Sequence, residues 1–383
     1  MAKVEVSADI LKWAADRSGK SDIINMSFPN WLKWINNETQ PTLKQLEKFA
    51  KATSIPLGYF FLDHPPVECL PIPHYRTIDD HQTSNPSPNL LETVQIMERR
   101  QGWMREYLID LGNDTLDFVG VKNVNSDPIE IAKEIRAKLG LKDGWASKYN
   151  TWQEALRMLY QKIENVGIIL VINGIVGNNT HRKLDVNEFR GFVLTDEYAP
   201  LIFINGADGK AAQMFTLAHE LAHVWFGVSA AFDLRNLQAA NNDIEKVCNI
   251  VAAEFLVPEI ELREIWKSVK NKDLKFQVLA RHFKVSEIVA ARRALDLTLI
   301  TRDEFFQFYQ NSTRAENHAS SSSSSGGDFY ASQNFRIGRR FGASVIRATM
   351  EGKLLYTEAY RLTGIRGKTF SEFATRLGFG GDV

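Results

Sequence analysis

Residues 219–223 read His-Glu-Leu-Ala-His, an H-E-x-x-H run inside an apolar stretch that favours a helix. Residues four apart lie one above the other on a helix, so the side chains of His219 and His223 leave the same face. Two such imidazoles can bind one Zn²⁺, and Glu220 lies beside them to transfer a proton. The pattern is typical of a zinc peptidase active site. The alternative is a helix with two half-buried histidines and a surface glutamate.

A catalytic zinc needs a third protein ligand and one open position for water. The next long helical segment, 243–256, offers Glu245 and Glu254, which are nine residues apart and therefore point to nearly opposite sides of a helix. Asn249 lies one turn after Glu245 and could hold a ligand histidine by a hydrogen bond. We therefore favour Glu245 over Glu254. Whichever glutamate is not the ligand is expected to be a surface or capping carboxylate.

These residues predict a hydrolytic mechanism. A bound Zn²⁺ lowers the pKa of its water, and Glu220 would take the proton as that water attacks a peptide carbonyl. A further side chain should stabilise the oxyanion, and His181 and Tyr198 lie in predicted loops from which they could do so. Both are weak candidates, because such residues are more often simply on the surface.

Composition excludes several classes of protein. The 46 Lys and Arg balance the 46 Asp and Glu, so no global basic field draws the chain to nucleic acid or membranes. Cys69 and Cys248 are no disulfide framework, which fits a reducing compartment. No apolar run of about 18 residues could span a bilayer, and the start lacks the pattern of a secretory signal. We expect a cytoplasmic protein without a membrane partner.

The pattern along the chain predicts an α+β, mostly helical fold. Short β-rich runs at 167–172, 191–194 and 200–204 should form a small sheet directly before a helix at 208–227. The Ser/Gly run at 320–327 should be a flexible linker. The predicted domains are a helical domain at 1–66, a connector and helix at 67–127, a peptidase domain at 128–312, a linker at 313–330 and a small helical module at 331–383.

Two segments together resemble the ImmA/IrrE metallo-endopeptidases. They are Phe-Thr-Leu-Ala-His-Glu-Leu-Ala-His at 215–223 and Ile-Glu-Lys-Val-Cys-Asn-Ile-Val-Ala-Ala-Glu-Phe-Leu-Val-Pro at 244–258, and the sheet residues 188–192 and 201–205 also fit. The resemblance covers roughly residues 128–300 and implies a zincin-like peptidase core. It implies Zn²⁺ bound by His219, His223 and Glu245, with Glu220 as the catalytic base. Family members typically cut repressor-like or regulatory proteins, but the substrate of this chain does not follow from the resemblance. We expect a protein substrate, namely a repressor, a regulator or a toxin–antitoxin partner.

Two segments resemble helix-turn-helix elements and are candidates for DNA contacts. Residues 40–62 are similar to the helix-turn-helix (XRE-type) domains often fused to such peptidases, but the stretch from Gly19 to Trp34 is too short for a full second helix and a recognition helix. We therefore favour a degenerate docking module there over DNA binding. Residues 279–293 also have a helix-turn-helix shape, for which packing beside the peptidase core is the preferred interpretation. Their basic residues that could touch phosphate are Arg281, Lys284, Arg292 and Arg293.

The C-terminal module interleaves basic and aromatic residues, as nucleic-acid surfaces do, although a solvated helix face is the commoner explanation. These residues are Arg336, Arg339, Arg340 and Arg347, with Phe335 and Phe341. The leading hypothesis for the whole chain is a zinc endopeptidase that acts on a regulatory partner protein. The alternatives are a DNA-binding regulator, or an antitoxin-like protein that uses the peptidase fold for binding without turnover.

Overall fold

The computed structural model describes residues 3–19, 21–66, 86–232, 243–269, 274–319 and 329–380. The chain forms two compact units, residues 1–71 with 76–95 and residues 72–75 with 96–383. Cys69 and the predicted flexible Ser/Gly run at 320–327 lie outside the described residues. Within the described ranges, no helix combines the length and the apolar character needed to cross a membrane.

The first unit packs short helices around aromatic side chains. Its elements are α1 (Ala8–Ser18), α2 (Ser21–Ser27), α3 (Trp31–Ile35), α4 (Leu43–Thr53) and the 3₁₀ helix η1 (Leu57–Phe61). Phe49 of α4 is fully buried and contacts the rings of Phe28, Trp31, Trp34 and Phe60. The stretch from 19 to 34 holds α2, which the sequence analysis missed, and most of α3. Both helices are short, at seven and five residues.

The second unit is built on a four-stranded mixed sheet. Its strands are β1 (Ile169–Asn173), β4 (Gly191–Leu194), β5 (Leu201–Asn205) and β6 (Ala230–Phe232), in the order β1-β5-β4-β6. Strand β1 is parallel to β5, whereas β4 is antiparallel to both β5 and β6. All residues of β1, β4 and β5 are buried, as expected for strands that read as continuous apolar runs. A separate hairpin pairs β2 (Ile175–Val176) with β3 (Asn179–Lys183).

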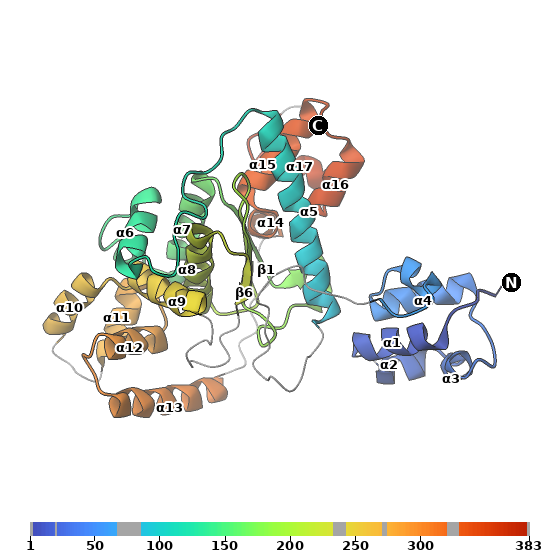
Figure 1. The fold of residues 1–383 in the computed structure, drawn as a ribbon, viewed down its shortest axis with the longest axis horizontal. Helices are drawn as coiled ribbons and strands as arrows, with labels where there is room; N and C mark the ends of the chain where they lie inside the picture. The colour runs from blue at the N-terminus through green and yellow to red at the C-terminus, as the bar shows by residue number, and fades with distance from the viewer. Residues whose placement is uncertain are drawn as a thin grey trace. The chain divides into compact units, whose positions relative to one another are not determined.

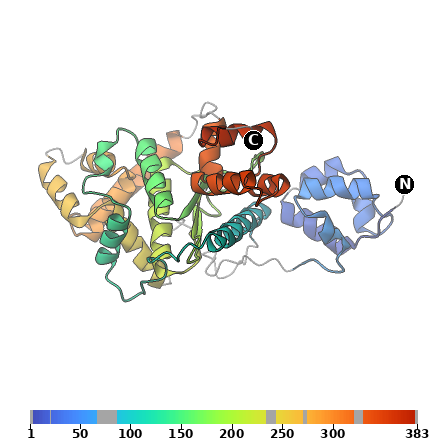
Figure 2. The ribbon, with the colours of Figure 1, turned by 90° about the horizontal axis from the view of Figure 1, so that it is seen from above.

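Helices cover this sheet from two sides. In Figure 1, α7, α8 and α9 lie on one side of the sheet and α14 lies on the other, against β1. Figure 2 shows the same separation from above. The bounds are α5 (Pro88–Asp110), α6 (Pro128–Lys138), η2 (Ala146–Lys148), α7 (Trp152–Asn165), α8 (Lys210–Phe226), α9 (Asp243–Leu256), α10 (Glu259–Ser268), α11 (Lys275–Phe283), α12 (Glu287–Asp296), α13 (Arg302–Ala319), α14 (Phe329–Ile337), α15 (Arg339–Met350), α16 (Tyr356–Thr363) and α17 (Lys368–Arg376).

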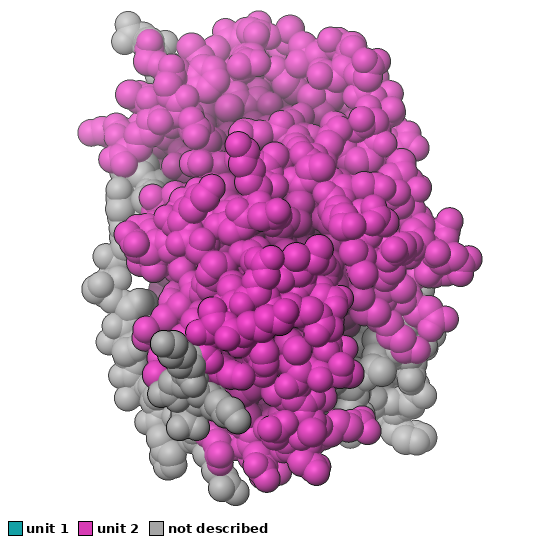
Figure 3. Space-filling view, turned by 90° about the vertical axis from the view of Figure 1, so that its left-hand side faces the viewer, with its two compact units in different colours: residues 1–71, 76–95 teal, residues 72–75, 96–383 magenta. Residues whose placement is uncertain are grey.

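The main core of the second unit lies between the sheet and helices α6 to α9. It joins strand residues such as Leu170 and Ile202 to Leu217 and Leu221 of α8 and Val251 of α9. Figure 3 shows the outer surface of this unit on the side where α10 to α12 lie. The fold is α+β and mostly helical with a small mixed sheet, which confirms the predicted fold class.

Candidate metal centre

Helix α8 carries the H-E-x-x-H run through the core of the second unit. It begins after Gly209 and ends at Gly227, which takes the left-handed conformation (φ 66°) that favours glycine at a helix end. A Cβ on Gly227 would stand only 2.7 Å from the Cα of Gly120, so this end of the helix also requires a glycine for close packing. Nearly all of α8 is buried, which fixes the positions of the side chains that it carries.

His219, His223 and Glu245 meet in one cluster between α8 and α9. The Nε2 atoms of the two histidines are 3.0 Å apart, and the Glu245 carboxylate lies 3.1 Å from Nε2 of His219 and 3.3 Å from Nε2 of His223. Both histidines are fully buried. Three potential ligand atoms therefore converge from two neighbouring helices.

Asn249 supports this arrangement from α9. Its Oδ1 lies 3.1 Å from Nδ1 of His219, one helical turn beyond Glu245. If a metal ion is bound, a proton on Nδ1 that is donated to Asn249 would leave the lone pair of Nε2 for that ion. Burial lowers the pKa of His219, which further favours the neutral imidazole.

The two histidines favour the ionised form of Glu245. Burial alone would raise the pKa of Glu245, but hydrogen bonds with His219 and His223 outweigh that effect and hold it well below its ordinary value. Glu245 is therefore an anionic oxygen donor beside two imidazole nitrogens. His₂Glu is a known ligand set of catalytic zinc.

Glu220 is placed differently from the three clustered side chains. It is fully buried, and neither carboxylate oxygen has a hydrogen-bond partner within the described part of the chain. Burial, and then the negative charge of Glu245, raise the pKa of Glu220 well above its ordinary value. Burying a carboxylate without a partner is energetically costly. Such groups are often found at functional sites, where they accept a proton or bind a ligand.

The donor set fits a divalent transition metal. A tetrahedral ion with arms of about 2.0–2.1 Å requires ligand atoms about 3.3 Å apart. The two Nε2 atoms are 3.0 Å apart, Oε2 of Glu245 lies 3.1 Å from His219, and Oε1 of Glu245 lies 3.3 Å from His223, so each imidazole has a carboxylate oxygen near that separation. The unpartnered oxygens of Glu220 lie on the residue next to His219, where a proton acceptor beside the metal would be needed.

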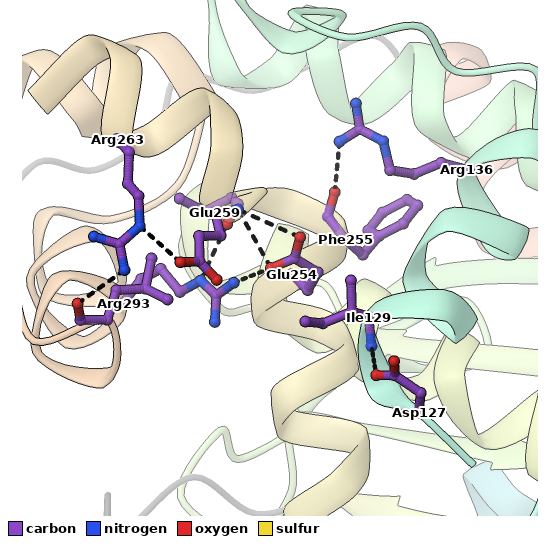
Figure 4. A network of polar contacts seen from close by, with 10 residues as sticks. Asp127, Ile129, Arg136, Glu254, Phe255, Glu259, Arg263 and Arg293 are labelled. Carbon is purple, nitrogen blue, oxygen red and sulfur yellow. Dashed lines mark hydrogen bonds and ion pairs between the residues drawn. The ribbon is translucent and has the colours of Figure 1, made fainter.

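Glu254, the alternative ligand, is part of another network at the end of α9 (Figure 4). Its carboxylate forms a buried ion pair with Arg293 of α12 and accepts hydrogen bonds from the backbone N–H of Glu259 at the start of α10. Arg293 also donates to the carbonyl of Val257. Glu254 thus caps a helix, as the sequence suggested for the unused glutamate, but it is buried and not on the surface.

The two oxyanion candidates lie outside the His219–His223–Glu245 cluster. His181 is exposed on strand β3 and not in a loop. Tyr198 packs its ring against the guanidinium of Arg105, at 5.6 Å from the ring centre. Gly191 of β4 also borders the site, and no sequence pattern indicated it. A Cβ on Gly191 would stand 2.7 Å from Cγ2 of Thr216 and 3.3 Å from Oε1 of Glu220.

The second helix-turn-helix shape is present in α11 and α12. Lys284 takes a left-handed conformation in the turn, and the Ser286 side chain caps α12 by accepting from the N–H of Val289. Lys284 and Arg293 are both buried, so neither is available to phosphate. Arg281 remains exposed and Arg292 pairs with Asp296, so packing accounts for two of the four basic residues.

Comparison with known families gives two partial matches. Residues 175–295 match the IrrE N-terminal-like domain of the peptidase M78 family. The match includes α8, α9 and the whole metal cluster, and it supports a metal-dependent peptidase type of function for this part of the chain. Residues 337–376 match a domain of unknown function, DUF8813. No curated protein matches the chain.

Proposed function

We propose that the chain is a zinc-dependent endopeptidase that cleaves a regulatory protein of the repressor or antitoxin type. The observation that carries the proposal is the convergence of His219, His223 and Glu245 beside the unpartnered carboxylate of Glu220. The match to the peptidase M78 family over the same residues supports it.

In this mechanism each side chain has a separate task. His219, His223 and Glu245 would hold Zn²⁺, which when bound supplies Lewis acidity and lowers the pKa of its water. Glu220 accepts the proton of the attacking water and returns it to the leaving amine. Because burial disfavours the charged form of Glu220, its carboxylate is a stronger base than an exposed glutamate.

The proposed substrate is a protein because the first unit offers apolar side chains to a partner. Ile23, Met26 and Leu32 are exposed by 59%, 85% and 63% on α2 and α3. Groups of exposed apolar residues are typical of protein-docking surfaces, whereas DNA contacts require Lys, Arg and polar groups. The first unit is therefore proposed as a docking module rather than a DNA reader.

The test compares Glu220→Gln with Glu264→Gln, which changes an exposed glutamate on α10. Cells producing each protein are analysed for new protein N-termini, and zinc is measured in the purified chains. We expect Glu220→Gln to keep one zinc per chain and to lose the new N-termini, by about 10²-fold or more in rate. The control should behave as the wild type. If Glu220→Gln yields the new N-termini at the wild-type rate, Glu220 is not the catalytic base, and if the wild type yields none, binding without turnover is favoured.

A further inference from the structure

The last part of the second unit concentrates positive charge. Between residues 337 and 376 there are eight Lys and Arg but only three Asp and Glu, whereas the whole chain has 46 of each kind. Two of the three acidic residues are used locally, because Glu351 pairs with Lys353 and Glu372 pairs with Arg376. The exposed cations in this part that have no ion-pair partner among the described residues are Arg339, Arg347, Arg361, Arg366 and Lys368.

Three of these cations surround the turn between α16 and α17, residues 364–367. Arg361 lies in the last turn of α16, Arg366 lies in the turn itself, and Lys368 begins α17. Gly367 precedes α17 with φ 52° and ψ −134°, a conformation that favours glycine. A Cβ on Gly367 would meet nothing within 4 Å, so the backbone at the start of α17 is open to an approaching group.

The start of α17 adds donors to this charge. The first N–H groups of a helix have no acceptor within it, and the helix dipole gives that end a partial positive charge. Phosphate oxygens are suited to such a position. The turn before α17 therefore combines positive side chains, an accessible backbone at Gly367 and the first N–H groups of the helix.

The β2–β3 hairpin contacts this turn. Nδ2 of Asn178, in the hairpin turn, donates to the carbonyl of Gly364 at 3.0 Å, so segments 186 residues apart in sequence are joined here. Strand β3 carries His181, Arg182 and Lys183 in succession and is largely exposed. We call the surface formed by Arg361 and residues 364–368 the basic turn surface.

We propose that the basic turn surface binds the phosphate backbone of nucleic acid, without reading its sequence. Phosphate contacts come from Lys, Arg and helix N-termini, which are the groups gathered here. An acidic protein partner would need apolar anchors at the centre of the interface, and Ile365, the one apolar residue of the turn, is buried.

The residues that carry this proposal differ from most of those that the sequence pattern suggested. Arg340 donates through its backbone and its guanidinium to Glu164, and burial lowers the pKa of both Arg336 and Arg340. Arg340 thereby attaches the module to α7. The exposed cations Arg361, Arg366 and Lys368 are accessible to a ligand.

The experiment measures fluorescence anisotropy of a labelled duplex DNA of arbitrary sequence with the full-length, zinc-loaded chain. With three phosphate contacts, affinity should fall about 40-fold between about 50 mM and about 200 mM NaCl. The double variant Arg366→Glu/Lys368→Glu should bind at least about 10-fold more weakly and lower the salt slope by about two. Zinc content and circular dichroism verify that the Arg366→Glu/Lys368→Glu variant is folded. A second double variant, Arg361→Gln/Arg366→Gln, removes charge without reversing it and should also weaken DNA binding, by a smaller factor.

The matched control is Lys44→Glu/Lys48→Glu, which changes the net charge equally but lies on α4 of the first unit. It should bind DNA as the wild type does. The proposal is overturned if this control loses binding while the turn variants keep it, or if the wild type does not bind. It is also overturned if polyglutamate competes as well as unlabelled DNA at equal charge, because the surface would then be one for acidic proteins.

Discussion

Glu245 and Glu254 lie on the same helix and meet opposite surroundings. The carboxylate of Glu245 faces two histidines, whereas that of Glu254 faces the guanidinium of Arg293. The first arrangement is suited to binding a metal ion. The second joins α9 to α12 through a buried pair, which is costly to break from one side because the remaining charge stays buried.

This difference predicts opposite effects of the same substitution. Glu254→Gln should lower the free energy of unfolding by about 3 kcal/mol and leave the zinc affinity of the folded protein unchanged, because Arg293 loses its buried partner. Glu245→Gln should abolish stoichiometric zinc binding and change the stability of the metal-free protein much less. Urea unfolding in a chelator and zinc titration measure the two effects. If Glu254→Gln loses zinc binding and Glu245→Gln keeps it, Glu254 is the metal ligand and Glu245 is not.

At the scale of elements, helices were predicted well and strand pairing was not. Local patterns place the segments 208–227 and 243–256 close to α8 and α9, because apolar spacing and the glycine at the end of α8 are properties of the segment itself. Strands β2, β3 and β6 were missed, because each is short and is defined by its pairing. Among the described residues, the partner of Glu254 is 39 positions away, which no local pattern reveals.

The packing of β4 against α8 predicts a strong effect at Gly191. A Cβ there would stand 2.7 Å from Cγ2 of Thr216 and 3.0 Å from the carbonyl of Phe203. Gly191→Ala should therefore cost about 1–3 kcal/mol of stability. It should also displace Glu220, and a shift of about 1 Å in a catalytic group can lower the rate about 100-fold. Gly102→Ala is the control, because its Cβ would meet nothing within 4 Å in α5. Wild-type stability and turnover in Gly191→Ala would contradict this view of the packing.

At the scale of the whole chain, the C-terminal helices belong to the same compact unit as the peptidase core. The N-terminus of α15 is held by two side chains of α7. The N–H of Arg340 donates to Oε1 of Glu164 at 3.0 Å, and the N–H of Arg339 donates to the hydroxyl of Tyr160 at 3.3 Å. The sequence predicted the helices of this module but not its attachment, because Glu164 and Arg340 are 176 residues apart.

This attachment makes stability depend on pH. Burial raises the pKa of Glu164 from 4.5 to about 7, against the opposing effects of the Arg340 N–H and the Tyr160 hydroxyl. The folded state therefore holds the proton more tightly than the unfolded state. The stabilisation is complete below about pH 4.5 and is lost as the pH rises through about 7, by up to about 3 kcal/mol.

Glu164→Gln should remove this dependence, because glutamine keeps the acceptor for the Arg340 N–H and does not ionise. We expect the difference in unfolding free energy between wild type and Glu164→Gln to change progressively from about pH 5 to about pH 8, with the wild type becoming relatively less stable. Urea unfolding across that range measures it, and the exposed Glu264→Gln serves as the control. Parallel stability curves for wild type and Glu164→Gln would show that Glu164 is ionised in the folded protein throughout, and that the capping of α15 does not depend on its proton.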